Sequence, residues 1–304
     1  MKVLVTGGAG LIGMALRRSL PAMGHEVTAV DVTDFGRDDN DLLLLPLSDT
    51  ERLEAIVIER DIEAIVHGGG ISGPVMERDR PAHVIEVNVM STVALLDISR
   101  RLGLKRFLLL SSHVVYGDAG GECIVEDRPL HPGTTYAASK VAGEALVESF
   151  SRQFGLSAAS LRLTRVYGPH RRANCFLREI ILKTAAGLPI SIACDPNYLY
   201  HYLHVDDVAE AVAACLAAPS LRHHAYNVTS GEVLTMPQIA AIVSLVLPTA
   251  RIELIPGTDD APEIQTDFSL ARIEADTGWR PRLTLAEGFM AYARALGADP
   301  MLAN

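Results

Sequence analysis

Two polar segments of this chain combine residue types that can move a proton at a hydroxyl group. Ser111 and Ser112 end a leucine-rich run, and Tyr136 and Lys140 follow farther on in a helical pattern. Residues four apart share one face of a helix, so the Lys140 ammonium is predicted to stand beside the Tyr136 phenol and to lower its pKa from about 10. The phenol can then act as acid and base, while a serine hydroxyl beside it holds the reacting oxygen.

A glycine-rich loop near the N-terminus has the spacing of a phosphate-binding turn. Gly7, Gly10 and Gly13 follow a predicted strand at 3–6 and open a predicted helix at 11–23. The first glycine permits the tight turn, the second lets the backbone approach a pyrophosphate, and the third lets the helix pack on the strand. The N-terminus of the helix presents free N–H groups and a partial positive charge to the anion. The loop therefore predicts a dinucleotide cofactor.

An acidic residue at the end of the next predicted strand indicates which dinucleotide binds. Asp31 follows the strand 27–30, where its carboxylate can accept hydrogen bonds from the adenosine ribose hydroxyls. The same carboxylate would repel the 2'-phosphate of NADP, so NAD is the expected cofactor. Arg37, a few residues farther on, is a feature that would favour NADP instead.

Short apolar runs alternate with longer amphipathic patterns through the first half of the chain. The predicted strands are 3–6, 27–30, 42–45, 64–67, 107–110 and 158–163. The predicted helices are 11–23, 50–60, 81–102 and 134–154. Such alternation is typical of a parallel sheet covered on both faces, so we expect an α/β fold with a doubly wound parallel Rossmann sheet.

The pattern loosens after residue 165, where glycine and proline break the chain into shorter pieces. We expect residues 1–165 to form the NAD-binding domain, with 203–229 returning to it through a helix and a strand. Residues 166–202 and 230–304 are expected to form a smaller C-terminal α/β lobe that binds the substrate.

Composition excludes several other classes of protein. A chain of 304 residues with 49% hydrophobic content can fill one large core or two unequal ones, and its net charge of -10 disfavours nucleic acid as a partner. The N-terminus lacks a signal-peptide pattern, and we expect no membrane-spanning segment, which would need roughly 20 apolar residues. The four cysteines lack CxxC spacing, so we expect a cytoplasmic protein with reduced thiols and no metal site.

Taken together, the motifs resemble those of the extended short-chain dehydrogenases, and within them the NAD-dependent epimerase/dehydratase family. The resemblance covers nearly the whole chain, and its motifs are TGGAGLIG at 6–13, IVHGGG at 65–70, Asn88-Val89, SSHVVYG at 111–117, YAASK at 136–140, VYGP at 166–169, HVDDVA at 204–209 and TGWRP at 277–281. Their shared order and spacing make chance agreement negligible. The resemblance implies a homodimer formed through two helices, the one after Asn88 and the one that carries Tyr136.

The same resemblance assigns roles to individual residues. The implied catalytic set is Ser112, Tyr136 and Lys140, because Ser112 stands four residues before Tyr116 in the serine motif. The residues implied to bind NAD are Gly7, Gly10, Leu11, Ile12, Gly13, Asp31, Asn88, Tyr136 and Lys140.

Four positions near the implied site depart from the pattern of relatives that act on nucleotide sugars. Dehydratases of the family carry an Asp-Glu pair where this chain has His113 and Val114, so dehydration is disfavoured. Nucleotide-sugar epimerases commonly carry an Arg-Asp pair where this chain has Tyr200 and His201. His113 could contact the substrate or cap the end of its strand.

The arginines of this chain stand at other places. The further family arginine expected near 256–262 is absent, and Asp259 and Asp260 lie there instead. Arg165 stands where asparagine is usual, and Arg171 and Arg172 follow the VYGP turn; the three are candidate substrate contacts, although the Arg171-Arg172 pair could simply be solvated.

We therefore expect an NAD-dependent oxidoreductase or epimerase that moves a hydride at a sugar or sugar-acid hydroxyl. An alternative is a nucleotide-sugar epimerase, such as a UDP-sugar 4-epimerase, and a second alternative is a catalytically idle NAD-binding sensor. The sequence does not separate an epimerase from a net dehydrogenase, because both begin with the same oxidation.

Overall fold

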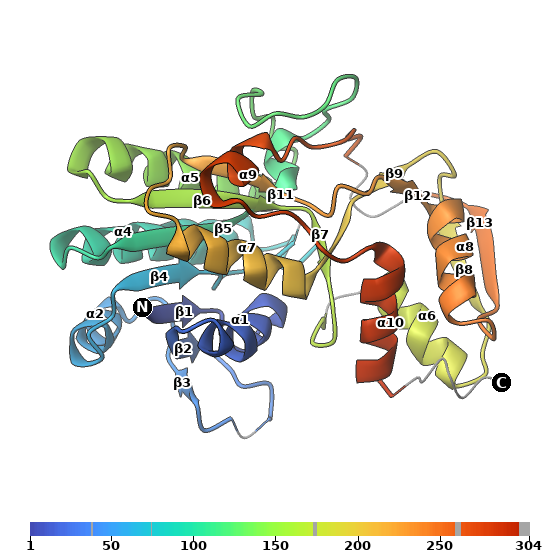
Figure 1. Cartoon of the computed structure of the whole chain (residues 1–304), viewed down its shortest axis with the longest axis horizontal. Helices are drawn as coiled ribbons and strands as arrows, with labels where there is room; N and C mark the ends of the chain where they lie inside the picture. The colour runs from blue at the N-terminus through green and yellow to red at the C-terminus, as the bar shows by residue number, and fades with distance from the viewer. Residues whose placement is uncertain (38, 74, 173–174, 259–262, 298–304) are drawn as a thin grey trace.

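The structure of the protein is a computed structural model, and it describes residues 1–304 except 38, 74, 173–174, 259–262 and 298–304. Seven parallel strands form one sheet in the order β11-β6-β5-β4-β1-β2-β3 (Figure 1). These strands are β1 (Lys2–Thr6), β2 (Glu26–Asp31), β3 (Leu42–Leu44), β4 (Ala64–His67), β5 (Arg106–Ser112), β6 (Ala158–Leu163) and β11 (Ala225–Val228). The expected doubly wound Rossmann sheet is confirmed, and the strand order reverses between β1 and β4, where such sheets form their ligand crevice.

Helices cover both faces of the sheet (Figure 1). One face packs against α1 (Leu11–Ala22), α7 (Val205–Ala217) and α9 (Ala271–Thr277), and the other against α2 (Thr50–Glu59), α4 (Ser91–Arg101) and α5 (Thr135–Phe154). Successive side chains of a strand point to opposite faces. In β1, Val3 and Val5 accordingly join the core under α1 and α7, whereas Leu4 joins the core under α2, α4 and α5.

Local sequence signals fix where α5 begins and ends. Thr134 caps the helix, since its hydroxyl accepts a hydrogen bond from the Ala137 N–H at 3.1 Å. Gly155 ends it in the left-handed conformation with φ of +70°. The cap places Tyr136 in the first turn, where the partial positive charge of the helix N-terminus favours a phenolate.

The stretch from Pro81 to Arg101 is helical throughout but not uniformly so. It consists of α3 (Pro81–Ile85), a π-helical turn η1 (Glu86–Met90) and α4. Its length of 21 residues and mean hydropathy of 1.3 would allow it to span a membrane, which corrects the expectation that no segment is long and apolar enough. In the folded chain it packs against α5, and 44% of its most apolar window is buried.

A second hydrophobic core lies in the C-terminal part, drawn at the right of Figure 1. Its elements are β7 (Arg165–Tyr167), α6 (Phe176–Ala185), β8 (Ile190–Cys194), β9 (Leu199–Tyr200), β10 (Tyr202–His204), β12 (Leu234–Thr235), α8 (Met236–Val246), β13 (Ile252–Pro256) and α10 (Leu285–Ala295). These strands form three two-stranded sheets, β10 with β7, β12 with β9 and β13 with β8. The exact boundaries of the two proposed domains stay a prediction.

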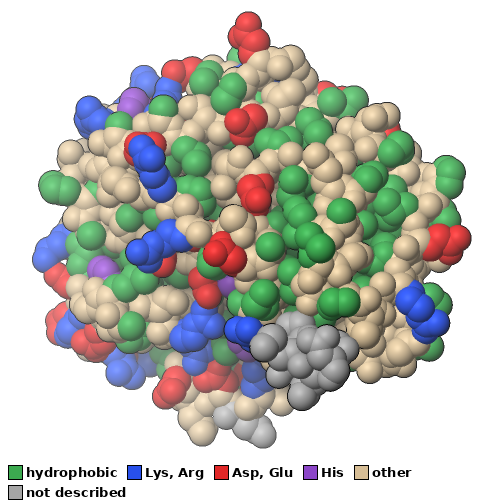
Figure 2. Space-filling view, turned by 45° about the vertical axis from the view of Figure 1, so that its right-hand side comes forward, with side chains coloured by type: hydrophobic (Ala, Val, Ile, Leu, Met, Phe, Trp, Pro, Cys, Tyr) green, Lys and Arg blue, Asp and Glu red, His purple; other side chains and the backbone are tan. Residues whose placement is uncertain are grey.

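The face that brings this C-terminal part forward carries broad areas of hydrophobic side chains between scattered charges (Figure 2). Exposed apolar residues of this part include Leu182, Leu245 and Ile255, and Leu188 in the turn between α6 and β8.

Candidate active site

The glycine loop follows β1 so closely that side chains are excluded from it. Gly7 has a φ of +74°, and a Cβ there would come within 2.8 Å of the Gly69 N atom. A Cβ on Gly13 would lie 2.1 Å from the Gly7 carbonyl oxygen. Helix α1 can therefore start against the end of β1 only because residue 13 is glycine.

The first turn of α1 leaves its backbone donors open. Gly10 is the N-cap and contributes no side-chain cap, and the turn contains no acidic residue. The N–H groups of Leu11, Ile12 and Gly13 have no acceptor within the helix, and the helix dipole adds positive charge beside them. A side-chain-free turn followed by open N–H donors fits the pyrophosphate of a dinucleotide.

The acidic residue at the end of β2 reaches this loop. One carboxylate oxygen of Asp31 accepts a hydrogen bond from the Ala9 N–H at 3.0 Å, and the other accepts from the Val32 N–H at 2.7 Å. Arg37 donates to the Ala9 carbonyl oxygen at 2.9 Å. Asp31, which would repel the 2'-phosphate of NADP, and Arg37, which would attract it, thus both contact Ala9.

The serine, tyrosine and lysine singled out from the sequence come together at the junction of β5 and α5. The Tyr136 hydroxyl lies close to the side chains of Ser112 and Ser72 and to the backbone of Gly73, and each of these polar groups acts to lower its pKa. Ser112 ends β5 and begins the short 3-10 helix η2 (His113–Tyr116). A substrate oxygen placed beside Ser112 would therefore meet the tyrosine proton directly.

Lys140 is held by the strand rather than by the tyrosine. Its Nζ donates to the Leu110 carbonyl oxygen at 2.9 Å and lies 5.9 Å from the centre of the Tyr136 ring. Burial lowers the pKa of Lys140 to about 8, and the carboxylate of Glu144 opposes that shift.

The expectation that the tyrosine pKa falls is wrong for this structure. Burial raises the pKa of Tyr136, and this effect outweighs the hydrogen bonds from Ser112, Ser72 and Gly73 and the positive charge of Arg171. The physical reason is that a phenolate loses far more hydration than a phenol does when it is enclosed. The resting phenol is protonated, which is the form that can donate to a keto oxygen.

Asn88 connects the central helix to the turn after β4. Its Oδ1 accepts from the Ile71 N–H at 2.8 Å, and its Nδ2 donates to the Ile71 carbonyl oxygen and to Ser139, both at 3.0 Å. Ser139 precedes Lys140 on α5. Asn88 thus fixes α5 against the turn that carries Ser72.

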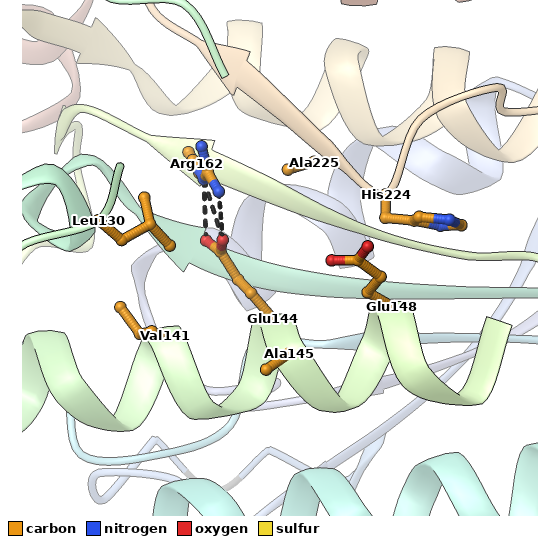
Figure 3. Close-up of a pocket in the computed structure, with 8 residues that line it drawn as sticks. All are labelled: Leu130, Val141, Glu144, Ala145, Glu148, Arg162, His224 and Ala225. Carbon is orange, nitrogen blue, oxygen red and sulfur yellow. Dashed lines mark hydrogen bonds and ion pairs between the residues drawn. The ribbon is translucent and has the colours of Figure 1, made fainter. Parts of the chain in front are cut away.

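A buried ionic network lies one helical turn beyond Lys140, between Glu144 of α5 and Arg162 of β6. Figure 3 shows this pair. Glu144 accepts from Arg162 Nη2 at 2.6 Å and Nε at 3.0 Å and 3.1 Å, and Ser111 donates to it at 2.5 Å. Arg162 also donates to the Tyr116 hydroxyl at 2.7 Å. A cavity of about 140 Å³ adjoins the pair and is lined by Leu130, Val141, Glu144, Ala145, Glu148, Arg162, His224 and Ala225.

The structure separates the three candidate arginines. Arg165 begins β7, and its guanidinium lies 5.3 Å from the centre of the Tyr200 ring. Arg171 donates to the Val166 carbonyl oxygen at 2.6 Å, and its charge acts on Tyr136. Arg172 instead stacks 4.2 Å above the Phe35 ring, in the loop after β2, so it lies on the cofactor side and away from Ser112.

Sequence reasoning missed two residues of the site, Ser72 and Gln265. Ser72 follows the glycine run after β4, and a hydroxyl at the carboxyl end of a central parallel strand was a signal that could have been used. Gln265 contacts His113 from a distant segment and carries no motif, so only the structure brings it in.

No group of three or more His, Cys, Asp or Glu side chains gathers as metal ligands within the described residues. All four cysteines are free thiols. Hydride chemistry without a metal stays a prediction.

The fold and the geometry at β5 and α5 define an enzyme of the extended short-chain dehydrogenase class. A family model described as the NAD-dependent epimerase/dehydratase family matches residues 3–229. The chain belongs to this family, and NAD is the cofactor.

Individual relatives are similar along nearly the whole chain. A UDP-glucose 4-epimerase of Mycolicibacterium smegmatis is 30% identical over 95% of this chain and 96% of its own length. UDP-glucuronic acid decarboxylase 1 of Arabidopsis thaliana is 29% identical over 95% of this chain and 68% of its own length. The solved UDP-glucose 4-epimerase of Thermus thermophilus, in complex with NAD, is 27% identical, covers 98% of this chain and 99% of its own, and superposes with a TM-score of 0.86.

Proposed function

We propose that this enzyme oxidises a sugar-like hydroxyl with NAD through Ser112, Tyr136 and Lys140, and that its substrate carries no nucleotide diphosphate. The observation that carries the catalytic part is the position of the Tyr136 hydroxyl beside Ser112 at the carboxyl end of β5, close enough for Ser112 to lower the pKa of the phenol. Bound NAD supplies the hydride acceptor. The chain itself supplies binding, orientation and proton transfer.

The proton passes between the substrate oxygen and the Tyr136 hydroxyl. Ser112 holds that oxygen, and Tyr136 takes its proton during oxidation or returns one during reduction. Oxidation requires the phenolate, which the charge of Arg171, the hydrogen bonds from Ser72 and Gly73 and the N-terminus of α5 all favour against burial. Lys140 is expected to hold the nicotinamide ribose while its ammonium faces the same side of the helix.

The substrate part of the proposal depends on two positions, Tyr200 at the end of β9 and His201 directly after it. A bound diphosphate needs cationic partners, because an unpaired buried anion costs several kcal/mol. At the place of the expected Arg-Asp pair, Tyr200 is 2% exposed and stacks on Tyr202, and His201 is 4% exposed. Burial lowers the pKa of His201 to about 4, so its imidazole is uncharged at neutral pH. Asp259 and Asp260, the other part of the sequence argument, lie outside the described residues.

Calorimetric titration of UDP and of dTDP into the NAD complex tests the substrate class. We expect no micromolar binding of either nucleotide. We also expect aldoses, aldonic acids or uronic acids to drive NAD reduction or epimerisation. Micromolar nucleotide binding that is lost in Arg165→Ala or Arg171→Ala would overturn the proposal.

A nucleotide-sugar 4-epimerase is the second candidate, favoured by the 30% identity to the enzyme of Mycolicibacterium smegmatis over 95% of this chain. Nucleotide binding in the same titration would establish it in place of the first.

We also expect a cytoplasmic homodimer that contacts through α4 and α5. The exposed apolar side chains of Met90, which directly precedes α4, and Phe154, at the end of α5, are available for such an interface. Light scattering of the purified protein measures the assembly, and a monomer at micromolar concentration would contradict it.

A further inference from the structure

Two histidines, His113 and His201, lie against one segment of the fold. The His113 ring meets the Phe268 ring edge-on at a centroid distance of 6.1 Å, and the His201 ring meets the same ring at 5.0 Å. Gln265 bonds to His113, and the carbonyl of Thr266 accepts from the His201 ring. Residues 265–268 therefore arrange both imidazoles.

The hydrogen bonds around Gln265 determine the tautomer of His113. The amide nitrogen of Gln265 donates to the carbonyl oxygens of His113 and Gly117 at 3.1 Å and 3.0 Å. Its amide oxygen must therefore face His113 Nδ1, at 2.5 Å, and accept a proton from it. Burial lowers the pKa of His113 to about 3, so the ring is neutral and Nε2 carries only a lone pair.

That Nε2 lone pair has no hydrogen-bond partner among the described residues. The His113 side chain is partly exposed. Its Nε2 is also absent from the set of fully buried polar atoms that lack a partner, so this nitrogen is not enclosed by the protein. His113 directly follows Ser112, whose hydroxyl contacts Tyr136. An acceptor is thus available one residue from the group that holds the reacting oxygen.

His201 is also a neutral imidazole with an unpartnered Nε2 within the described residues, but it is more deeply buried than His113. Its ring donates to the Thr266 backbone, while Nε2 is buried and unpartnered within the described part of the chain. Both imidazoles therefore offer acceptors and no free donor. A phosphate or carboxylate oxygen would meet a lone pair at either ring, whereas a hydroxyl can donate to it.

We propose that His113 is a specificity-determining residue whose Nε2 accepts a hydrogen bond from a substrate hydroxyl on the carbon next to the oxidised one. The inference rests on the proposed function, because it names a feature of that same substrate. The substrate class becomes a sugar or sugar acid with a vicinal diol at the reacting carbon.

The test compares substrates that differ by that one hydroxyl. Aldoses, aldonic acids and uronic acids are assayed for NAD reduction or epimerisation, NMR of the product locates the reacting carbon, and the analogue without the neighbouring hydroxyl is made. The unmodified enzyme should prefer the hydroxylated compound by about tenfold or more in kcat/KM, mostly through KM. His113→Phe keeps a ring without the acceptor and should abolish this preference.

Two further variants make the result specific. His113→Gln can place an amide oxygen near the position of Nε2 and should restore part of the preference. His83→Phe alters a half-buried imidazole on α3 and should leave the preference unchanged. An unchanged preference in His113→Phe overturns this inference and leaves the proposed function standing. Absence of turnover with every compound overturns the proposed function, and this inference with it.

Discussion

Glu144 lies one helical turn beyond Lys140 on α5, and its carboxylate sustains the positive charge of that lysine against burial. Three consecutive residues at the end of β5 contact three successive turns of α5. Ser112 meets Tyr136, the Leu110 carbonyl meets Lys140, and Ser111 meets Glu144. Helix α5, which carries the proposed catalytic residues, is therefore aligned on β5 by the same contacts that influence the charges of its side chains.

Glu144→Gln should lower the pKa of Lys140 below its present value of about 8. Glutamine keeps the shape of the side chain but removes the negative charge, and it leaves Arg162 as an uncompensated cation nearby. NMR titration of 13C-labelled lysine measures this pKa in the folded protein. A lower melting temperature is also expected, because a buried ion pair that loses one partner costs about 3–5 kcal/mol.

The matched control for this experiment is Glu148→Gln, one turn farther along α5. Glu148 lines the same cavity (Figure 3) but pairs with Arg152 near the surface. It should leave both the pKa of Lys140 and the melting temperature nearly unchanged. A Lys140 that titrates alike in the Glu144→Gln and unmodified proteins would contradict the electrostatic role of Glu144.

Tyr136→Phe should abolish turnover while NAD binding is retained, because the change removes only the proton-transferring hydroxyl. Ser112→Ala should lose less, on the order of 1–3 kcal/mol in the activation barrier, since one hydrogen bond to the reacting oxygen is removed. Steady-state rates together with NAD titration by fluorescence separate the two effects. A near-normal rate in Tyr136→Phe would rule out its assignment as acid and base.

Sequence reasoning succeeded where local patterns determine structure. Alternating apolar runs predicted the strands of the parallel sheet, and the spacing of Gly7 and Gly13 predicted the turn whose crowding the structure displays. The pairing of Ser112 with Tyr136 was implied by the family resemblance of their two motifs, one at the carboxyl end of a strand and the other at the start of a helix.

Sequence reasoning failed for features that depend on contacts between residues far apart in the chain. The pKa of Tyr136 depends on its enclosure by the turn that carries Ser72, which no spacing along the chain reveals. Gln265 reaches His113 across 152 positions of sequence. Arg172 looked equivalent to Arg171, but the Phe35 ring draws it to the cofactor side.

Asp31→Ala should narrow the preference for NAD over NADP. In the unmodified protein the Asp31 carboxylate lies against the glycine loop at Ala9, where it would repel a 2'-phosphate, and Arg37 is already present beside it to attract one. Fluorescence titration of both cofactors against both proteins gives the ratio of affinities. Equal affinities for NAD and NADP in the unmodified protein would refute the role given to Asp31.

Hydrogen bonds around His67 allow only its neutral form. The Thr6 hydroxyl accepts from the Gly69 N–H at 3.0 Å, and among the described residues the acceptor for its own proton is His67 Nδ1, at 2.7 Å. The Ser91 hydroxyl donates to the Val87 carbonyl oxygen at 2.6 Å, so it accepts from His67 Nε2 at 3.2 Å. A second proton on the ring would face a donor, and burial lowers the pKa of His67 to about 3.

The protein should therefore lose stability as the pH falls below about 6.5, the pKa of an unfolded histidine. In the folded protein the pKa is about 3 for His67, about 3 for His113 and about 4 for His201. Below about pH 6.5 the unfolded chain therefore binds protons at these three residues that the folded protein does not bind. Each such imidazole steepens the loss by up to about 1.4 kcal/mol per pH unit. Urea unfolding between pH 5 and 6.5 measures the slope, above the range in which most carboxylates titrate. His67→Asn should reduce the slope by nearly one proton, and an identical slope in the variant would mean that His67 is protonated in the folded protein.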